Sequence, residues 1–138
     1  MSASSNSVFL TTSNDFHQAV LEAAGPVLVE FTASWCAPCR ALAPVLEELG
    51  RRHAGRVRVA VVDVEASPEL AQAHRVTAMP TLIAFHRGQV VAHAIGFGGR
   101  ARVEKLFDEL AALPPSPMAA ATATPSPTPP SRTDRRAP

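Results

Sequence analysis

The sequence predicts an α/β fold in which a central mixed β-sheet is flanked by helices on both faces. Two nearly continuous apolar runs rich in β-branched residues, 27–32 and 57–64, are typical of strands covered on both sides. A stretch with apolar residues at helical spacing, 36–54, separates them and predicts a parallel crossover. Two later runs, 81–86 and 90–95, flank a glycine-containing loop and predict an antiparallel hairpin. The complete order is β-α-β-α-β-α-β-β-α.

The N-terminal part contributes a short strand and a helix. Residues 8–10 form an apolar strand candidate. One of the polar residues 12–14 is expected to cap a helix that continues to Ala24, where Gly25 and Pro26 end it. The apolar face of this helix holds Phe16, Val20 and Leu21.

The middle of the chain supplies two more helices. Within the helix at 36–54, Pro44 is expected to produce a bend and Gly55 to end the helix. Pro68 fits the first turn of a short helix that reaches His74.

The composition changes after the last helix. Residues 96–99 break the strand pattern, and an amphipathic helix follows that ends near Leu113. Of the 13 prolines, eight lie in residues 114–138, where one methionine is the only apolar side chain larger than alanine or proline. Such a segment cannot bury enough apolar area to offset its ordering entropy. We therefore predict one domain over 1–113 and a disordered Pro/Ala/Thr-rich tail over 114–138.

The charge balance excludes several classes of partner. The 13 Lys and Arg residues against 12 Asp and Glu residues leave no basic excess for a phosphate backbone. The N-terminal residues have neither the basic region nor the apolar run of a secretory signal, and no stretch is long enough for a transmembrane helix. We therefore expect a soluble cytoplasmic protein without a nucleic-acid or membrane partner. Structural disulfides are uncommon in that compartment, so the two cysteines need another explanation.

Those cysteines lie three positions apart, in Cys36-Ala37-Pro38-Cys39, where a strand gives way to the long helix. Sulfurs at i and i+3 of a first helical turn lie on the same side and can close a small disulfide ring. Unpaired N–H groups at a helix start favour a thiolate and commonly lower a thiol pKa from about 8.5 towards about 7. We therefore expect Cys36 to be the nucleophile and Cys39 the resolving thiol. Ala37 and Pro38 are structural residues of the ring, which Pro38 stiffens.

Two other interpretations of the pair remain open. A zinc site needs two further ligands, but there is no other cysteine and the five histidines contain no H-x(3–5)-H pair, so no metal site is expected. Inert core thiols are the second alternative, because free cysteine is often buried. The neighbours Trp35, Ala37 and Pro38 favour an exposed turn instead.

The stretch FTASWCAPCRALAPVLEEL resembles the active-site segment of the thioredoxin family, in which W-C-x-P-C-[KR] precedes a helix kinked by a proline, here Pro44. Glu30 matches the family's buried acid in the preceding strand. The segment 76–82 is similar to its loop with a cis-proline, here Pro80, and Gly96 matches a glycine beside its groove. The resemblance extends over the predicted domain and implies a thioredoxin fold.

That resemblance implies a redox reaction with protein disulfides. Cys36 would attack a disulfide in a client protein to form a mixed disulfide, which Cys39 would resolve, leaving the pair oxidised and the client with two thiols. Glu30 would accept the proton of Cys39, because burial in a strand raises the pKa of a carboxyl group. The alternative for Glu30 is a tolerated polar residue whose side chain reaches the edge of the sheet.

A docking surface is also implied. A cis Pro80 facing the cysteines would let the Met79 backbone pair with an extended client segment as an added strand. The apolar surface would be bordered by Trp35, Ala78, Met79, Pro80 and Gly96. Ordinary turn and packing roles are the alternative, above all for Ala78.

The sequence departs from the family pattern near the buried acid. Glu30 stands where the family usually has aspartate, and Val61 where many members have a lysine. Loss of that cation removes a neighbour that favours the ionised carboxyl, so we expect a higher Glu30 pKa than in lysine-bearing relatives. Ala37 replaces the commoner glycine, and these changes bear on redox potential and rate more than on the reaction.

We therefore predict a protein-disulfide reductase that binds no cofactor and carries its redox-active group as the Cys36–Cys39 disulfide. By resemblance, a flavoprotein thioredoxin reductase drawing on NADPH would return the electrons to a monomer that acts on disulfide-containing clients. The alternative is a module of the same fold that binds partners, or acts as a holdase, without redox turnover.

Overall fold

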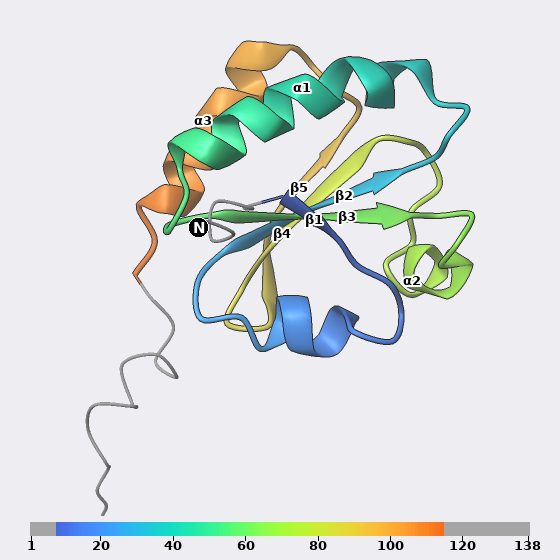
Figure 1. The fold of residues 1–138 in the computed structure, drawn as a ribbon, viewed down its shortest axis with the longest axis horizontal. Coiled ribbons are helices and arrows are strands. Elements are labelled where there is room, and N and C mark those ends of the chain that lie inside the picture. Colours follow the sequence, from blue (N-terminus) through green and yellow to red (C-terminus); the bar gives the residue numbers. More distant parts are fainter. Residues whose placement is uncertain (1–7, 115–138) are drawn as a thin grey trace, which may run out of the picture.

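A computed structural model describes residues 8–114, which form a mixed sheet with helices on both faces (Figure 1). The five strands are β1 (Val8–Leu10), β2 (Val27–Thr32), β3 (Arg58–Asp63), β4 (Thr81–His86) and β5 (Gln89–Ile95). Their spatial order is β1-β3-β2-β4-β5. β3 pairs in parallel with both β1 and β2, whereas β4 pairs antiparallel with both β2 and β5. The predicted fold class and order of strands are confirmed.

Two layers of helices cover the sheet. The helices α1 (Ala37–Arg52) and α3 (Arg100–Ala111) lie on one face, and the π-helical turn η2 (His17–Leu21) and α2 (Pro68–Ala73) lie on the other (Figure 1). An apolar core fills the space between the sheet and each layer. Within residues 8–114, none of the helices has the length and apolar character needed to cross a membrane.

Strand β2 lies in the middle of the sheet and separates the two cores. Val29 and Phe31 belong to the core under η2 and α2, whereas Leu28 belongs to the core under α1 and α3. Because side chains alternate along a strand, Glu30 shares the face of Leu28 and points towards α1. The register places Glu30 between Val61 of β3 and Leu82 of β4.

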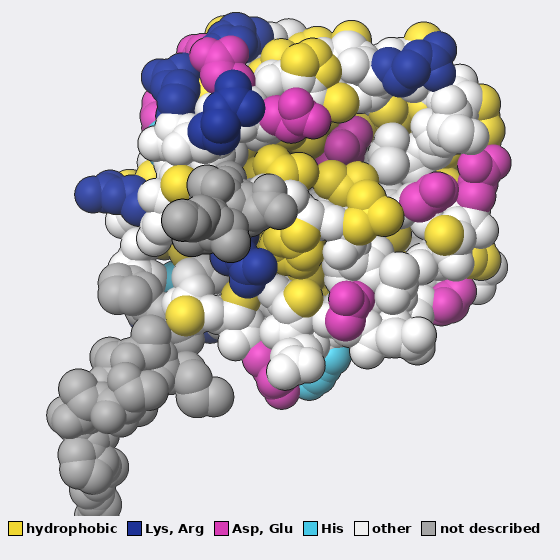
Figure 2. Space-filling view, in the orientation of Figure 1, with side chains coloured by type: hydrophobic (Ala, Val, Ile, Leu, Met, Phe, Trp, Pro, Cys, Tyr) yellow, Lys and Arg dark blue, Asp and Glu magenta, His cyan; other side chains and the backbone are white. Residues whose placement is uncertain are grey.

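An apolar surface lies on the side of the molecule where the edge strand β1 runs. Leu10 is 71% exposed, and hydrophobic side chains gather at the centre of this face (Figure 2). On the same strand, the ring of Phe9 lies under the guanidinium of Arg58, 4.4 Å from the ring centroid.

The regular helix predicted from residues 12–14 to Ala24 is wrong in length and type, because only η2 forms. The Asp15 carboxylate accepts hydrogen bonds from the Thr12 N–H and the Thr11 hydroxyl, both at 2.8 Å. Such local bonds compete with a regular helix and favour a turn. Phe16 and Val20 are nevertheless buried, as the predicted apolar face requires.

The hairpin loop between β4 and β5 is one residue shorter than predicted. Arg87 and Gly88 both have positive φ, 59° and 78°, as a two-residue type I′ turn requires, and Gln89 already pairs with His86. A bulge near Ala84 shifts the register. His93 therefore lies opposite Ile83 and His86 opposite Gln89, so the two histidines are not cross-strand partners.

The C-terminal end of the domain is attached to the sheet. The ring Nε2 of the buried His86 lies 2.6 Å from the carbonyl oxygen of Pro114. The predicted tail lies outside the described residues beyond Pro114, so its disorder stays a prediction.

The hairpin turn generates a stability prediction. Gly88→Ala should destabilise the protein more than Gly55→Ala does. Both glycines have positive φ, which costs an L-residue roughly 1–2 kcal/mol. A Cβ at Gly88 would also lie 3.2 Å from the Leu21 carbonyl oxygen, whereas a Cβ at Gly55 has nothing within 4 Å. Urea unfolding of the two variants measures the difference, and equal losses would show that the contact with Leu21 is unimportant.

Candidate active site

The two cysteines close a disulfide at the start of α1. Cys36 is the N-cap residue and Cys39 lies in the first turn, with their Cα atoms 5.3 Å apart. The backbone N–H of Cys39 donates a hydrogen bond to Cys36 Sγ at 3.2 Å. First-turn N–H groups have no partner within the helix and favour negative charge. The geometry therefore favours a thiolate at Cys36 when the pair is reduced.

The turn before α1 and the helix itself are held by local features of the sequence. Arg40 Nη1 donates a hydrogen bond to the Ser34 carbonyl oxygen at 2.9 Å, which ties the helix back to the turn. Pro38 occupies the first turn, where the missing N–H costs nothing. Pro44 lies inside α1, where its missing N–H leaves one carbonyl of the preceding turn without its helical donor.

The disulfide is buried beneath exposed neighbouring residues. Trp35 is 63% exposed, and Ala37 and Pro38 are exposed as well, as the sequence predicts. Cys36 and Cys39 are each only 3% exposed. The sulfur atoms are therefore accessible only between the surrounding side chains.

The loop before β4 lies beside the cysteine pair. Met79 packs against the cluster that contains both cysteines, and the Met79-Pro80 peptide bond is cis, as predicted. The Thr81 hydroxyl donates to the Ala78 carbonyl oxygen at 2.6 Å. The Gly96 N–H donates to the Pro80 carbonyl oxygen at 2.7 Å, so three of the predicted docking residues belong to one bonded arrangement. Pro80 itself is buried.

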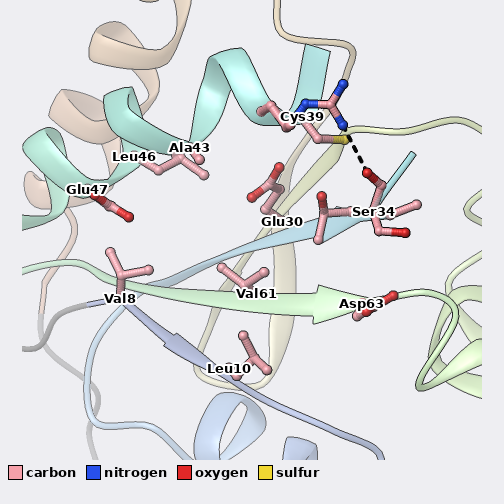
Figure 3. A pocket seen from close by; sticks show the side chains of 13 residues that line it. Val8, Leu10, Glu30, Ser34, Cys39, Ala43, Leu46, Glu47, Val61 and Asp63 are labelled. Carbon is pink, nitrogen blue, oxygen red and sulfur yellow. Dashed lines mark hydrogen bonds between the residues drawn. The ribbon is translucent and has the colours of Figure 1, made fainter. Parts of the chain in front are cut away.

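The carboxyl group of Glu30 is buried close to this site. Glu30 is 3% exposed, and its Oε2 has no hydrogen-bond partner among the described residues. Glu30 and Cys39 line the same pocket (Figure 3). Burial raises the pKa of Glu30 from its ordinary value of 4.5 to about 7. This burial does not fit the alternative in which the carboxyl reaches the edge of the sheet.

Metal-ligand geometry is not found in the part of the chain that the structure describes. Among residues 8–114, no three or more His, Cys, Asp and Glu side chains lie close enough together to hold a metal ion. The two cysteines are bonded to each other.

Residues 7–111 match the Thioredoxin family. The chain belongs to the thioredoxin family. Thioredoxin C-2 of Corynebacterium nephridii is 42% identical over 99 residues, which cover 72% of this chain and 92% of the relative. A thioredoxin of Mycobacterium tuberculosis is 44% identical over 90 residues, 65% of this chain and 78% of the relative. A bifunctional thioredoxin reductase/thioredoxin of Mycobacterium leprae is 42% identical over 90 residues, 65% of this chain but 20% of that longer protein.

Family membership and the cysteine geometry together define the activity. The chain has the thioredoxin fold and is a thiol-disulfide oxidoreductase, a protein-disulfide reductase of the thioredoxin type. Its redox-active group is the disulfide between Cys36 and Cys39.

The surroundings of Glu30 explain its raised pKa. Val61 lies directly across from Glu30 on β3 and contributes no charge. Desolvation by burial is the cause of the higher pKa. The prediction of a raised pKa is therefore confirmed, and the comparison with lysine-bearing relatives stays a prediction.

One residue that contacts Gly96, a predicted docking residue, has no signature in the sequence. Arg102 Nη2 donates hydrogen bonds to the carbonyl oxygens of Ile95 and Gly96, at 2.9 and 3.0 Å. An exposed arginine on an amphipathic helix has no distinctive pattern, so only the arrangement in space reveals this contact.

The buried carboxyl predicts a pH-dependent loss of stability. Because its pKa is higher in the folded protein, Glu30 supports folding when protonated. That contribution is complete below about pH 4.5 and is lost as the pH rises to about 7. Relative to Glu30→Gln, the oxidised wild-type protein should lose up to about 3 kcal/mol of unfolding free energy between about pH 4.5 and 8, because each pH unit between the unfolded and folded pKa values is worth about 1.4 kcal/mol.

Urea unfolding at several pH values measures this loss. Glu47→Gln, which removes an exposed carboxyl of α1, is the matched control and should not change the pH dependence. A difference between wild type and Glu30→Gln that stays constant with pH would show that Glu30 ionises as freely in the folded protein as in the unfolded chain.

Proposed function

We propose that Cys36 and Cys39 divide the reduction of a client disulfide between them. The Cys36 thiolate attacks one sulfur of the client disulfide, so that a mixed disulfide forms and the client's other sulfur leaves as a thiolate. Cys39 then attacks Cys36 Sγ, which releases the second client thiol and leaves the Cys36–Cys39 disulfide. Two electrons pass to the client. The observation that carries this assignment is the hydrogen bond from the Cys39 N–H to Cys36 Sγ at the helix start.

Glu30 is the proton acceptor for Cys39 in this proposal. Both residues line one pocket, and a pKa of about 7 leaves the carboxyl partly ionised at neutral pH. The missing hydrogen-bond partner of Oε2 supports the same role, because the oxygen is free to accept a proton.

Clients dock on the surface beside the cysteines in this proposal. The surface is bordered by Trp35, Ala78, Met79, Pro80 and Gly96, and an extended client segment pairs with the Met79 backbone. Ala37, Pro38 and Pro44 act structurally, by shaping the ring and the helix that carries it. The packing of Met79 against the cysteine cluster supports this placement.

Electrons reach the disulfide from NADPH through a flavoprotein thioredoxin reductase. The name of the bifunctional relative from Mycobacterium leprae, which joins a reductase with a thioredoxin, supports this partner. We place the protein in the cytoplasm as a monomer that acts on disulfide-containing proteins. Its catalytic unit is the domain 1–113, and in the tail 114–138 the residues after Pro114, which contacts His86, are dispensable.

The cysteine roles predict unequal reactivity. In the reduced protein, Cys36 should be alkylated by iodoacetamide about tenfold faster than Cys39 at pH 7, because its thiolate is stabilised by the helix start. Cys39→Ser should accumulate a mixed disulfide with insulin, whereas Cys36→Ser should form none. Mass mapping of the alkylated cysteines and non-reducing electrophoresis measure both outcomes. Equal alkylation rates would contradict the assigned roles. A mixed disulfide trapped by Cys36→Ser alone would show that the two roles are reversed.

The role of Glu30 predicts a specific slow step. A thiol with a pKa of about 8.5 is only about 3% thiolate at pH 7, so a base can accelerate its attack by up to about 30-fold. Glu30→Gln should therefore slow resolution of the mixed disulfide by about tenfold or more at pH 7, with the first attack unchanged and the effect smaller above about pH 8.5. Rapid-quench single turnovers separate the two steps. Glu47→Gln is the control, and a slower first attack in Glu30→Gln would indicate a general structural defect.

The proposed domain boundary predicts that the tail is dispensable. A chain ending at Pro114 keeps the contact with His86 and should reduce insulin with dithiothreitol at the full-length rate. Thermal unfolding of both chains checks that the fold is retained. A several-fold loss of activity with unchanged thermal stability would place part of the client site in residues 115–138.

A further inference from the structure

A pocket of about 490 Å³ opens between α1 and the strands β1 and β3, on one side of Glu30. Its apolar walls come from β1, β3 and α1 (Figure 3). The apolar lining residues include Val8, Leu10, Ala43, Leu46 and Val61. This volume lies within the range of about 300–1,000 Å³ that is usual for small-molecule sites.

The pocket is separate from the proposed docking surface for clients. None of the residues that border that surface lines the pocket. The strand order explains the separation, because β4, which follows the Met79 and Pro80 loop, lies on the other side of β2 from β3 and β1. A small molecule in the pocket and a client on the docking surface can therefore be bound together.

One polar atom in the pocket has no partner. Glu30 Oε2 has no hydrogen bond within the described structure, and the residue that carries it is only 3% exposed. Figure 3 shows its carboxyl group between α1 and the strands, pointing into the pocket. A buried acceptor of this kind gains free energy from any hydrogen-bond donor that reaches it.

The charged residues that line the pocket indicate which kind of hydrogen-bond donor it would bind. Three carboxyl groups, those of Glu30, Glu47 and Asp63, line the pocket with a single guanidinium, that of Arg40. Arg40 already donates to the Ser34 carbonyl oxygen. The surplus of negative charge favours a cation. Because no cluster in residues 8–114 is suited to a metal ion, the apolar walls favour an organic cation.

We propose that this pocket is a second binding site, which takes a small organic ammonium with an apolar body. The ammonium binds the Glu30 carboxylate, and the alkyl chain packs against Val61 and Leu46. Such a charge-assisted bond is stronger than a neutral one, and the apolar walls contribute through burial of the chain. The site does not depend on Glu30 acting as the proton acceptor for Cys39.

Binding at this site couples to the protonation of Glu30. The ammonium binds the ionised carboxyl, so affinity falls as the pH falls through about 7, and bound ligand lowers the pKa of Glu30. The other titratable or charged groups that line the pocket are Arg40, Glu47 and the Cys39 sulfur from α1 and Asp63 from β3. In the oxidised protein Cys39 does not titrate, which leaves Glu30 as the buried titratable group of the pocket.

The test uses the oxidised full-length chain and butylammonium chloride at about pH 8. Methyl NMR should show saturable shifts at Val61 and Leu46, with no shift at Met79. Glu30→Gln should weaken binding about tenfold or more, because it removes the charge of the acceptor and keeps its shape. 1-Butanol, which has the same body without the charge, should bind at least about tenfold more weakly than butylammonium. The ¹³C titration of the Glu30 carboxyl should move to lower pH with butylammonium present.

A second pair of variants keeps the test decisive if Glu30→Gln fails to fold. Ala43→Leu fills the pocket from α1 without changing a charge and should abolish the shifts. Ala41→Leu, two positions away on an exposed part of the same helix and not in the pocket lining, should leave them unchanged. Three results would overturn the proposal: equal affinity for 1-butanol and butylammonium, methyl shifts that persist in Ala43→Leu, or shifts that do not saturate. The pocket would then be one that holds water only. Because no thiol reacts, these outcomes say nothing against the proposed roles of Cys36 and Cys39.

Discussion

Strand β2 is hydrogen-bonded along both of its edges, and this pairing fixes which way Glu30 points and where α1 begins. It pairs in parallel with β3 and antiparallel with β4 over almost its whole length. A shift of one residue would turn Glu30 towards the core under η2 and Phe31 towards α1. The same pairing places the C-terminal end of β2 close to the start of α1. The strand therefore positions the two cysteines as well as Glu30.

The helix start can act on Cys36 only if α1 is held in place, and apolar packing holds it. Leu42, Leu46 and Leu49 are completely or almost completely buried, in one cluster with Phe107 of α3. An ion pair between Arg100 and Glu48 also joins the two helices, at 2.8 Å, but the two side chains are 41% and 44% exposed. The pair is bidentate but partly exposed and screened by solvent, so it contributes less than the burial of the leucine side chains. The orientation of the Cys39 N–H towards Cys36 Sγ therefore depends on the core beneath the helix.

Much of the fold could be predicted because the informative patterns are local. The apolar run of β2 and the helical spacing of α1 lie within single segments, and the structure keeps both close to the predicted bounds. The helix predicted before β2 is too long because the bonds of Asp15 with Thr11 and Thr12 compete with the periodic pattern. Glu30 could be found because an acid in an apolar strand is conspicuous.

The pocket and the Arg102 contact could not be predicted, since each depends on segments that are distant in the sequence. The pocket needs β1, β3 and α1 to meet around Glu30, and only the sheet order brings Val8 and Val61 beside Ala43. Arg102 reaches Ile95 and Gly96 only because α3 turns back along the end of β5. Neither arrangement produces a periodic pattern or a motif along the chain.

The burial of Glu30 without a partner combines two effects that cannot be separated. Desolvation opposes ionisation and therefore costs stability at neutral pH, but the same desolvation brings the pKa to about 7, where a carboxyl can both accept and release a proton. A cation at position 61 would reduce the loss of stability and would also lower the pKa of Glu30. The apolar Val61 therefore keeps the pKa of the Glu30 carboxyl high, and the protein is less stable at neutral pH as a result.

The sheet order gives the Glu30 carboxyl different neighbours on its two sides. Cys39 lines the pocket together with Glu30, whereas none of the proposed docking residues does, and the pocket opens on the side of β3 and β1. A client at the proposed docking surface would therefore leave the approach to Glu30 from the pocket open.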